Sequence, residues 1–499
     1  MKKLHLRQNE YKRLIEMQGY LSVLAALVFP LILALCLVLI EGCRQNTLKL
    51  EAECVVDIGL NSVLAEYHRE MQEQYDLFFI DTSYGTWQAS YERTEERLRT
   101  YIAKNICPED VFAGAVLDGL QKKIYLDLLQ LEAESVEITG ISLATDNQGY
   151  NLQKQAIQAA ETNMGITAVD AVLDWVRVVE ENDLTTNQVE RELQELEERL
   201  DQMSKKDELK ESEWIDRLTE NPGYEMWEAR KKGMLSWVMQ LITGCSDKSI
   251  GTERYISERK AAGEINKGTI SGKKEISLYE KLLFQHYLFQ YLGDHSDVKE
   301  DACLDYQIEY LLFGESADST NLMKTAASIC GMRETANLLY LLRSSEKRAQ
   351  VNTMASVLST ILLVPEAEPV FEGLLIILWT CAESILDTGS LLKGGRVPLL
   401  KNDDSWKSDL KNLFQFGEES EEDREMGLNY EDYLRIFLYM SDLETITYRL
   451  MDIMEMDIRK TAGNQYFRMD ACVDYLECCV VMEGAAGFTY ELTHGKGYR

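Results

Sequence analysis

LSVLAALVFPLILALCLVLI, residues Leu21 to Ile40, decides how this 499-residue chain is organised. The stretch carries no charge. At about 1.5 Å per residue, a helix of this length crosses the roughly 30 Å apolar core of a bilayer. The charged residues before it are mostly basic, five lysines and arginines against two glutamates, and short basic flanks stay in the cytoplasm. We therefore predict a cytoplasmic basic tail over 1–18, a transmembrane helix over 19–41 and a cell-membrane protein whose bulk lies outside the cytoplasm.

Three other interpretations of this segment are open. A cleaved signal has a shorter apolar region, of about 7–15 residues, and no small-x-small cleavage motif follows here. Ile40 to Cys43 is a degenerate lipobox, with Glu41 two residues before the cysteine. A pilin-type leader would be cut after Gly19, but Leu24 stands where such leaders carry a glutamate. An uncleaved signal anchor is favoured, and Gly19 is the candidate leader-processing position.

The apolar pattern continues beyond the bilayer. From Leu48 to Met71, apolar residues recur in steps of three and four, which is one face of a helix. No proline interrupts this stretch, although Pro30 could kink the earlier part. We predict one helix from about 20 to about 74, with an amphipathic stalk over 42–82.

The remaining residues, 83–499, predict an acidic extracytoplasmic domain of the α+β class, predominantly α, with a small antiparallel sheet. A helical-hairpin insertion is expected at about 150–270, with a heptad seam at Val189, Leu193, Leu196, Leu200 and Met203. Residues 373–382 are apolar but too few for a second span. Helices are further expected within 87–131, 276–293, 321–364 and 428–461, and strands over 135–143, 470–481 and 487–492. Residues 304–313 could form a strand or a helix turn, and their alternation favours a strand.

Charge and composition exclude several classes of function. The net charge of −32 excludes a nucleic-acid partner, because phosphate binding needs clustered lysine and arginine. The simplest interpretation of the acidic surface is that it is solvated, although it could attract basic partners or divalent cations. The eleven cysteines form no CxxC pair, and the five histidines form no HExxH motif. No phosphate-binding glycine loop or nucleophile elbow occurs. We predict no enzyme, no catalytic residue, no cofactor and no metal.

Several short motifs carry a resemblance to a known family. They are Leu60 to Tyr67 with Glu70, Tyr75 to Phe79 with Tyr84-Gly85, Ser257-Glu258-Arg259 with Gly263, Ile308 to Gly314, Ala382-Glu383-Ser384 with Asp387, Gly394-Gly395 to Leu399, Trp406, Tyr430 with Asp432 to Arg435, and Met451-Asp452. Together they resemble a clostridial membrane-protein family that is known only as a domain of unknown function. The resemblance covers roughly 20–85 and 255–475.

Members of that family are typically encoded beside tight-adherence (Flp-type) pilus genes and pseudopilin-like proteins. The resemblance implies a non-catalytic, membrane-anchored structural or assembly-associated protein, minor pseudopilin-like, of a pilus or secretion system. Its expected partners are the lipid bilayer and the membrane proteins of that system. The alternatives are an envelope sensor or binding module and, third, an envelope hydrolase.

Overall fold

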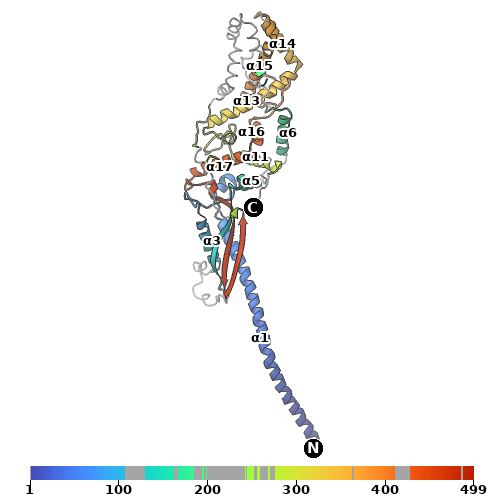
Figure 1. The fold of residues 1–499 in the computed structure, drawn as a ribbon, viewed down its shortest axis with the longest axis vertical. Coiled ribbons are helices and arrows are strands. Elements are labelled where there is room, and N and C mark those ends of the chain that lie inside the picture. Colours follow the sequence, from blue (N-terminus) through green and yellow to red (C-terminus); the bar gives the residue numbers. More distant parts are fainter. Residues whose placement is uncertain are drawn as a thin grey trace.

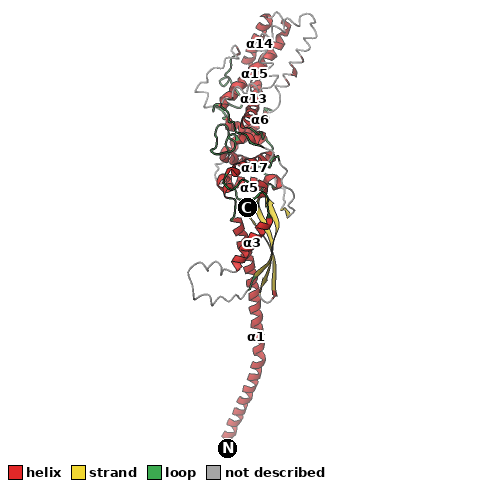
Figure 2. Cartoon of the chain, turned by 90° about the vertical axis from the view of Figure 1, so that its left-hand side faces the viewer, coloured by secondary structure: helices red, strands yellow, loops and turns green. Residues whose placement is uncertain are grey.

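The protein is an elongated molecule, with one long helix projecting from a head (Figure 1). The computed structural model describes residues 2–106, 130–161, 167–184, 244–251, 255–258, 268–269, 276–361, 365–410, 427–484 and 487–498, together with isolated positions at 191, 194, 195, 198 and 242. The sheet lies beside the upper part of the long helix, and two groups of helices follow along the same axis (Figures 1 and 2).

The long helix is α1, Lys2–Leu64, which runs through Pro30 without a break. It begins eighteen residues before the predicted start, so the basic tail and the apolar stretch belong to one helix. From Val23 onward α1 is long and apolar enough to cross a membrane. The large apolar side chains from Val23 to Ile40 are 40–73% exposed. Between Val23 and Ile40, the segment that we call the first half of α1, the helix therefore presents apolar side chains on its whole circumference.

The second half of α1 is part of the head. Its buried residues share a core with the sheet and with α3, Tyr91–Ile106. Gly59 marks the closest approach to α3, since a Cβ there would stand 2.9 Å from Cγ1 of Ile102. The face that α1 buries consists of Leu48, Ala52, Val55, Val56, Leu60, Val63 and Leu64.

The predicted end of the first helix is wrong: α1 ends at Leu64, about ten residues early. The backbone N–H of His68 donates to the carbonyl of Phe79 at 2.8 Å, which holds the chain in a turn. A separate, short helix, α2, Arg69–Tyr75, then begins, with His68 as its N-cap. Helical spacing resumes in α2, so the apolar pattern alone does not reveal the break.

The sheet is small and mainly antiparallel, as predicted. Its strands are β1, Ile80–Asp81; β2, Glu132–Leu143; β3, Gly268–Thr269; β4, Cys472–Gly484; and β5, Phe488–Gly497. The central strand β4 pairs antiparallel with β2 along one edge and with β1 and β5 along the other. A short parallel pair joins β2 to β3. The alternation that predicted strands at 135–143, 470–481 and 487–492 is confirmed.

The middle of the head is helical and holds the largest hydrophobic core. Its helices are α5, Asp146–Glu161; α6, Thr167–Glu181; α11, Leu278–Tyr291; α12, Gln307–Phe313; α16, Tyr430–Met440; and α17, Leu443–Lys460. The predicted strand at 304–313 is wrong. Residues 307 to 311 are all buried. Their alternation of apolar and polar types therefore does not mark a strand with one buried and one solvent-exposed face. Gly314, at φ +67°, closes α12 as a left-handed cap.

The far end of the head consists of α13, Asp318–Arg343; α14, Ser345–Ile361; and α15, Glu368–Leu392. Short 3₁₀ turns lie at Pro365–Ala367 and Met469–Ala471. By length and composition α15 could also cross a membrane, but 67% of its apolar window is buried inside the protein. It is a core helix, as residues 373–382 predicted. The five residues of the predicted heptad seam lie outside the described residues.

Candidate functional site

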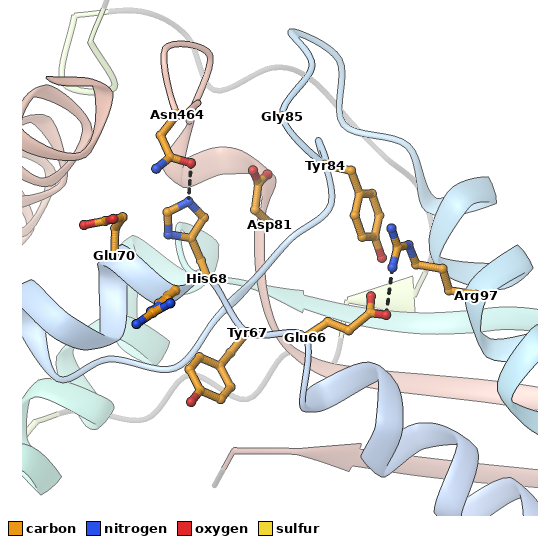
Figure 3. Close-up of a pocket in the computed structure, with 10 residues that line it drawn as sticks. Glu66, Tyr67, His68, Glu70, Asp81, Tyr84, Gly85, Arg97 and Asn464 are labelled. Carbon is orange, nitrogen blue, oxygen red and sulfur yellow. Dashed lines mark hydrogen bonds and ion pairs between the residues drawn. The ribbon is translucent and has the colours of Figure 1, made fainter. Parts of the chain in front are cut away.

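An open pocket lies at the neck of the molecule, where α1 ends (Figure 3). Its volume is about 430 Å³. Segments far apart in sequence form it: the link between α1 and α2, the strand β1 with its following turn, α3, and the turn after α17. We call it the neck pocket. It is lined by Glu66, Tyr67, His68, Arg69, Glu70, Asp81, Tyr84, Gly85, Arg97 and Asn464.

Local backbone structure positions one wall of the neck pocket. Asp81 ends β1, and its carboxylate accepts hydrogen bonds from the backbone N–H and the hydroxyl of Ser83, both at 2.8 Å. Tyr84 and Gly85 follow with positive φ of 48° and 78°. Glycine adopts this conformation without strain, which lets the chain reverse and leaves the Tyr84 ring in the pocket wall.

His68 uses both of its ring nitrogens within the protein. Its Nδ1 accepts from the backbone N–H of Met71 at 3.3 Å, so the ring proton lies on Nε2. That nitrogen then donates to Oδ1 of Asn464 at 3.2 Å. Burial lowers the pKa of His68, which keeps the imidazole neutral near pH 7. A histidine whose acceptor nitrogen already caps a helix is poorly placed to act as a general base.

Glu66 and Arg97 form an ion pair in the wall of the neck pocket. One oxygen of Glu66 accepts from Arg97 at 2.7 Å and from the hydroxyl of Tyr101 at 2.5 Å. The guanidinium of Arg97 also lies over the ring of Tyr84, 4.5 Å from its centre. The second oxygen of Glu66, Oε2, is buried and has no hydrogen-bond partner among the described residues. In the described part of the chain, no group of three or more histidine, cysteine, aspartate or glutamate residues could hold a metal.

A second constellation lies deep in the far end of the head. We call Arg333, Glu383, Asp387 and Lys401 the ionic cluster; all four side chains are fully buried. The ammonium of Lys401 lies 2.6 Å from Glu383 and 2.7 Å from Asp387. Asp387 also accepts from Arg333 at 3.1 Å. Two cations face two anions, so the buried charges balance.

The ionic cluster also satisfies the backbone of the loop that follows α15. Arg333 donates to the carbonyls of Pro398 and Leu399, at 2.9 and 2.7 Å. Glu383 accepts from the backbone N–H groups of Lys407 and Ser408, at 2.9 and 2.7 Å. Burial alone would raise the pKa of Asp387, but the charges of Arg333 and Lys401 hold it below its usual range. The cluster is a structural tie between α13, α15 and this loop.

Two further carboxyl groups are buried without a cation bonded to them among the described residues. Glu309 accepts from the hydroxyl of Tyr430 at 2.7 Å and from the backbone N–H of His295 at 3.0 Å. Burial raises its pKa to about 8. Asp452 accepts from Tyr310 at 3.0 Å and from Ser257, and burial raises its pKa to about 6. Both acids join helices of the middle core.

The structure brings together many of the residues behind the family resemblance. Glu383, Asp387 and the 397–399 segment meet at the ionic cluster, while Tyr310 meets Asp452 and Glu309 meets Tyr430. Gly19, the candidate processing position, lies inside α1. The sequence does not reveal the neck pocket, because His68 and Asn464 lie 396 positions apart.

Comparison with known proteins gives one match. Residues 212–484 match the model of a family of unknown function, DUF5702. No curated protein and no solved structure matches the chain. The matched region contains the ionic cluster and both buried carboxyl groups, whereas α1 precedes it. Because the match covers more than half of the sequence, the protein belongs to this family of unknown function.

Proposed function

We propose that this protein is a membrane-anchored structural or assembly-associated protein of a tight-adherence (Flp-type) pilus or secretion system, minor pseudopilin-like and non-catalytic. It would span the cell membrane once, with its N-terminus in the cytoplasm and its head outside. The observation that carries the proposal is the division of α1. One half exposes apolar side chains all round, and the other half shares a core with the sheet of the head.

This division suits a protein that holds its head at a fixed position relative to the membrane better than it suits an enzyme that converts a substrate. A helix shared by the bilayer and the head leaves no flexible hinge between them, so the head is held at a fixed height. Pilin-like subunits present their heads on a long helix in the same manner. The neck pocket supports the non-catalytic part of the proposal, because both ring nitrogens of His68 are already engaged within the protein.

The proposal is tested by co-isolation and deletion. Detergent extracts of the native membrane should yield this protein together with inner-membrane components of the pilus system. A strain that lacks the gene should assemble few or no pili, and the full-length gene should restore them. Normal pilus assembly in the deletion strain would refute the proposal.

A second candidate function, an envelope binding module, is favoured by the neck pocket alone. The pocket is open, polar and large enough for a small ligand. Asn464→Ala would remove the partner of His68 and alter the wall of the pocket. The variant should melt at a lower temperature than the wild type, because His68 and Thr461 each lose a hydrogen bond to Asn464. If the protein acts as a binding module, cell-wall fragments that stabilise the wild type should no longer raise the melting temperature of this variant. No stabilisation of the wild type by any fragment would count against this candidate.

A further inference from the structure

The side of α1 that faces away from the sheet carries its own apolar stripe. Between residues 42 and 64, all of which are described, Leu50 and Ile58 are the only large apolar side chains that are exposed, at 62% and 45%. Cys43 and Cys54 are exposed on the same side, and Thr47 lies between them. The head core therefore accounts for one face of α1 and leaves this opposite face uncovered.

The same row of positions extends into the apolar half of the helix, where all sides carry apolar residues. Leu33 and Ile40 are 50% and 63% exposed, and Cys36 is exposed between them. From Leu33 to Cys54 the steps alternate strictly between three and four residues. A repeat averaging about 3.5 residues is the spacing with which one helix packs along another. We call these positions the α1 seam: Leu33, Cys36, Ile40, Cys43, Thr47, Leu50 and Cys54, followed by Ile58.

Thr47 does not disrupt the α1 seam. Its hydroxyl donates to the backbone carbonyl of Cys43 at 2.9 Å, so its donor is satisfied inside the helix. Its methyl group is then left for packing. The spacing thus points to a helical occupant rather than to a strand or a loop.

The seam also defines the direction of that occupant. It runs from the apolar half of α1 into the half beside the head without a break, so a matching helix must leave the bilayer in the same direction. A second α1 has the same seam at the same depth in the same membrane. In a parallel pair, Asn46 would flank Glu51 of the other helix and Glu53 would flank Ile58. No like charges meet at these positions.

We propose that α1 pairs in parallel with α1 of a second copy of this chain through the α1 seam. The pairing deepens the proposed function, because it rests on the anchoring of α1 in a membrane. The two heads lie on the outer sides of the pair, because the sheet packs on the opposite face of α1. The structural unit in the membrane is then a dimer.

Cysteine cross-linking in the intact membrane tests the pairing. The starting variant combines Cys36→Ser, Cys43→Ser and Cys54→Ser in the full-length chain. These cysteines are exposed, so serine does not disturb the head core. One cysteine is then restored or added on the seam, at 43, 50 or 54, or off the seam by Gln45→Cys or Lys49→Cys. The starting variant keeps the other eight of the chain's eleven cysteines, so its own cross-linking is measured as the background. Copper phenanthroline oxidises neighbouring thiols to a disulfide, and a gel without reductant separates dimer from monomer.

We expect a covalent dimer of twice the monomer mass from a cysteine at each seam position. A cysteine at position 45 or 49 should give no such dimer. Leu50→Lys in a chain that keeps Cys43 should reduce cross-linking at Cys43, because a charge enters the seam. Equal cross-linking at all positions, none at the seam, or a product of another mass would overturn the pairing. If seam cross-links are absent while the protein stays in the membrane fraction, the pairing fails and the anchoring stands. If the protein is missing from that fraction, both fail.

Discussion

The two halves of α1 have the same secondary structure and opposite surroundings. From Val23 to Ile40 the apolar side chains face outward on every side, whereas from Leu48 to Leu64 a single apolar face is covered by the sheet and α3. Helix periodicity alone does not separate these cases; the width of the apolar surface does. A helix that is apolar on its whole circumference is typical of lipid surroundings, and a helix with a single apolar stripe is typical of packing against protein.

The largest effect is expected from charges in the first half. In the double variant Leu31→Arg/Leu35→Arg, each arginine should oppose insertion by about 2.5–3.5 kcal/mol, or about 5–7 kcal/mol together. Most of the protein should then leave the membrane fraction on alkaline carbonate extraction. Arginines at Gln45 and Asn46, beyond the apolar stretch, serve as the matched control and should have no such effect. Full retention of the double variant would show that this half does not hold the protein in the bilayer.

The next effect should be confined to the head, far from α1. Lys401→Met removes the cation between Glu383 and Asp387 and leaves a buried net charge. The free energy of unfolding of the detergent-extracted protein should fall by about 3–5 kcal/mol. Membrane association should not change. Chemical denaturation measures the loss, and a change under about 1 kcal/mol would contradict a structural role for the ionic cluster.

A matched pair of leucines tests the second half of α1. Leu60 is fully buried against the sheet, and Leu50 on the same helix is 62% exposed. Leu60→Ala should lower the free energy of unfolding by about 2–5 kcal/mol. Leu50→Ala should change it by at most about 0.5 kcal/mol in the monomer. Equal effects of the two substitutions would mean that this half of α1 is not part of the head core.

The last prediction concerns pH. The pKa of Glu309 rises from 4.5 to about 8 in the folded protein, so the folded state holds its proton more tightly than the unfolded state. The stabilisation is full below pH 4.5 and is lost as the pH rises to about 8. Glu309→Gln should flatten the decline in melting temperature over this interval, with the smallest change at its acidic end. An unchanged pH profile would show that Glu309 is not a buried neutral acid.

Much of the fold follows from local pattern. Alternation located β2, β4 and β5, and helical spacing located α11, α13, α14, α16 and α17. The two errors share a physical cause. The break after Leu64 depends on a hydrogen bond from His68 to Phe79, and α12 is buried along its first five residues, so tertiary contacts rather than local periodicity decide both.

The candidate sites were beyond sequence reasoning for a similar reason. The ionic cluster joins α13, α15 and a loop, and each of its residues taken alone resembles a surface charge. Two signals were available. Glu383 and Asp387 are acidic residues that directly follow the apolar run 373–382 in α15, and both belong to the motifs of the family resemblance. They indicated structural importance, but not which cations would face them.

The division of α1 into an anchor and a core helix is tested most directly by the intact mass of the protein recovered from the membrane fraction. The account predicts a mass that includes residues 21–40. Loss of only residues 1–19 would place a processing site at Gly19 and leave the anchor in place. A soluble protein whose mass lacks residues 1–40 would show that the stretch is a signal that is removed. That result would contradict the division of α1 into an anchor and a core helix.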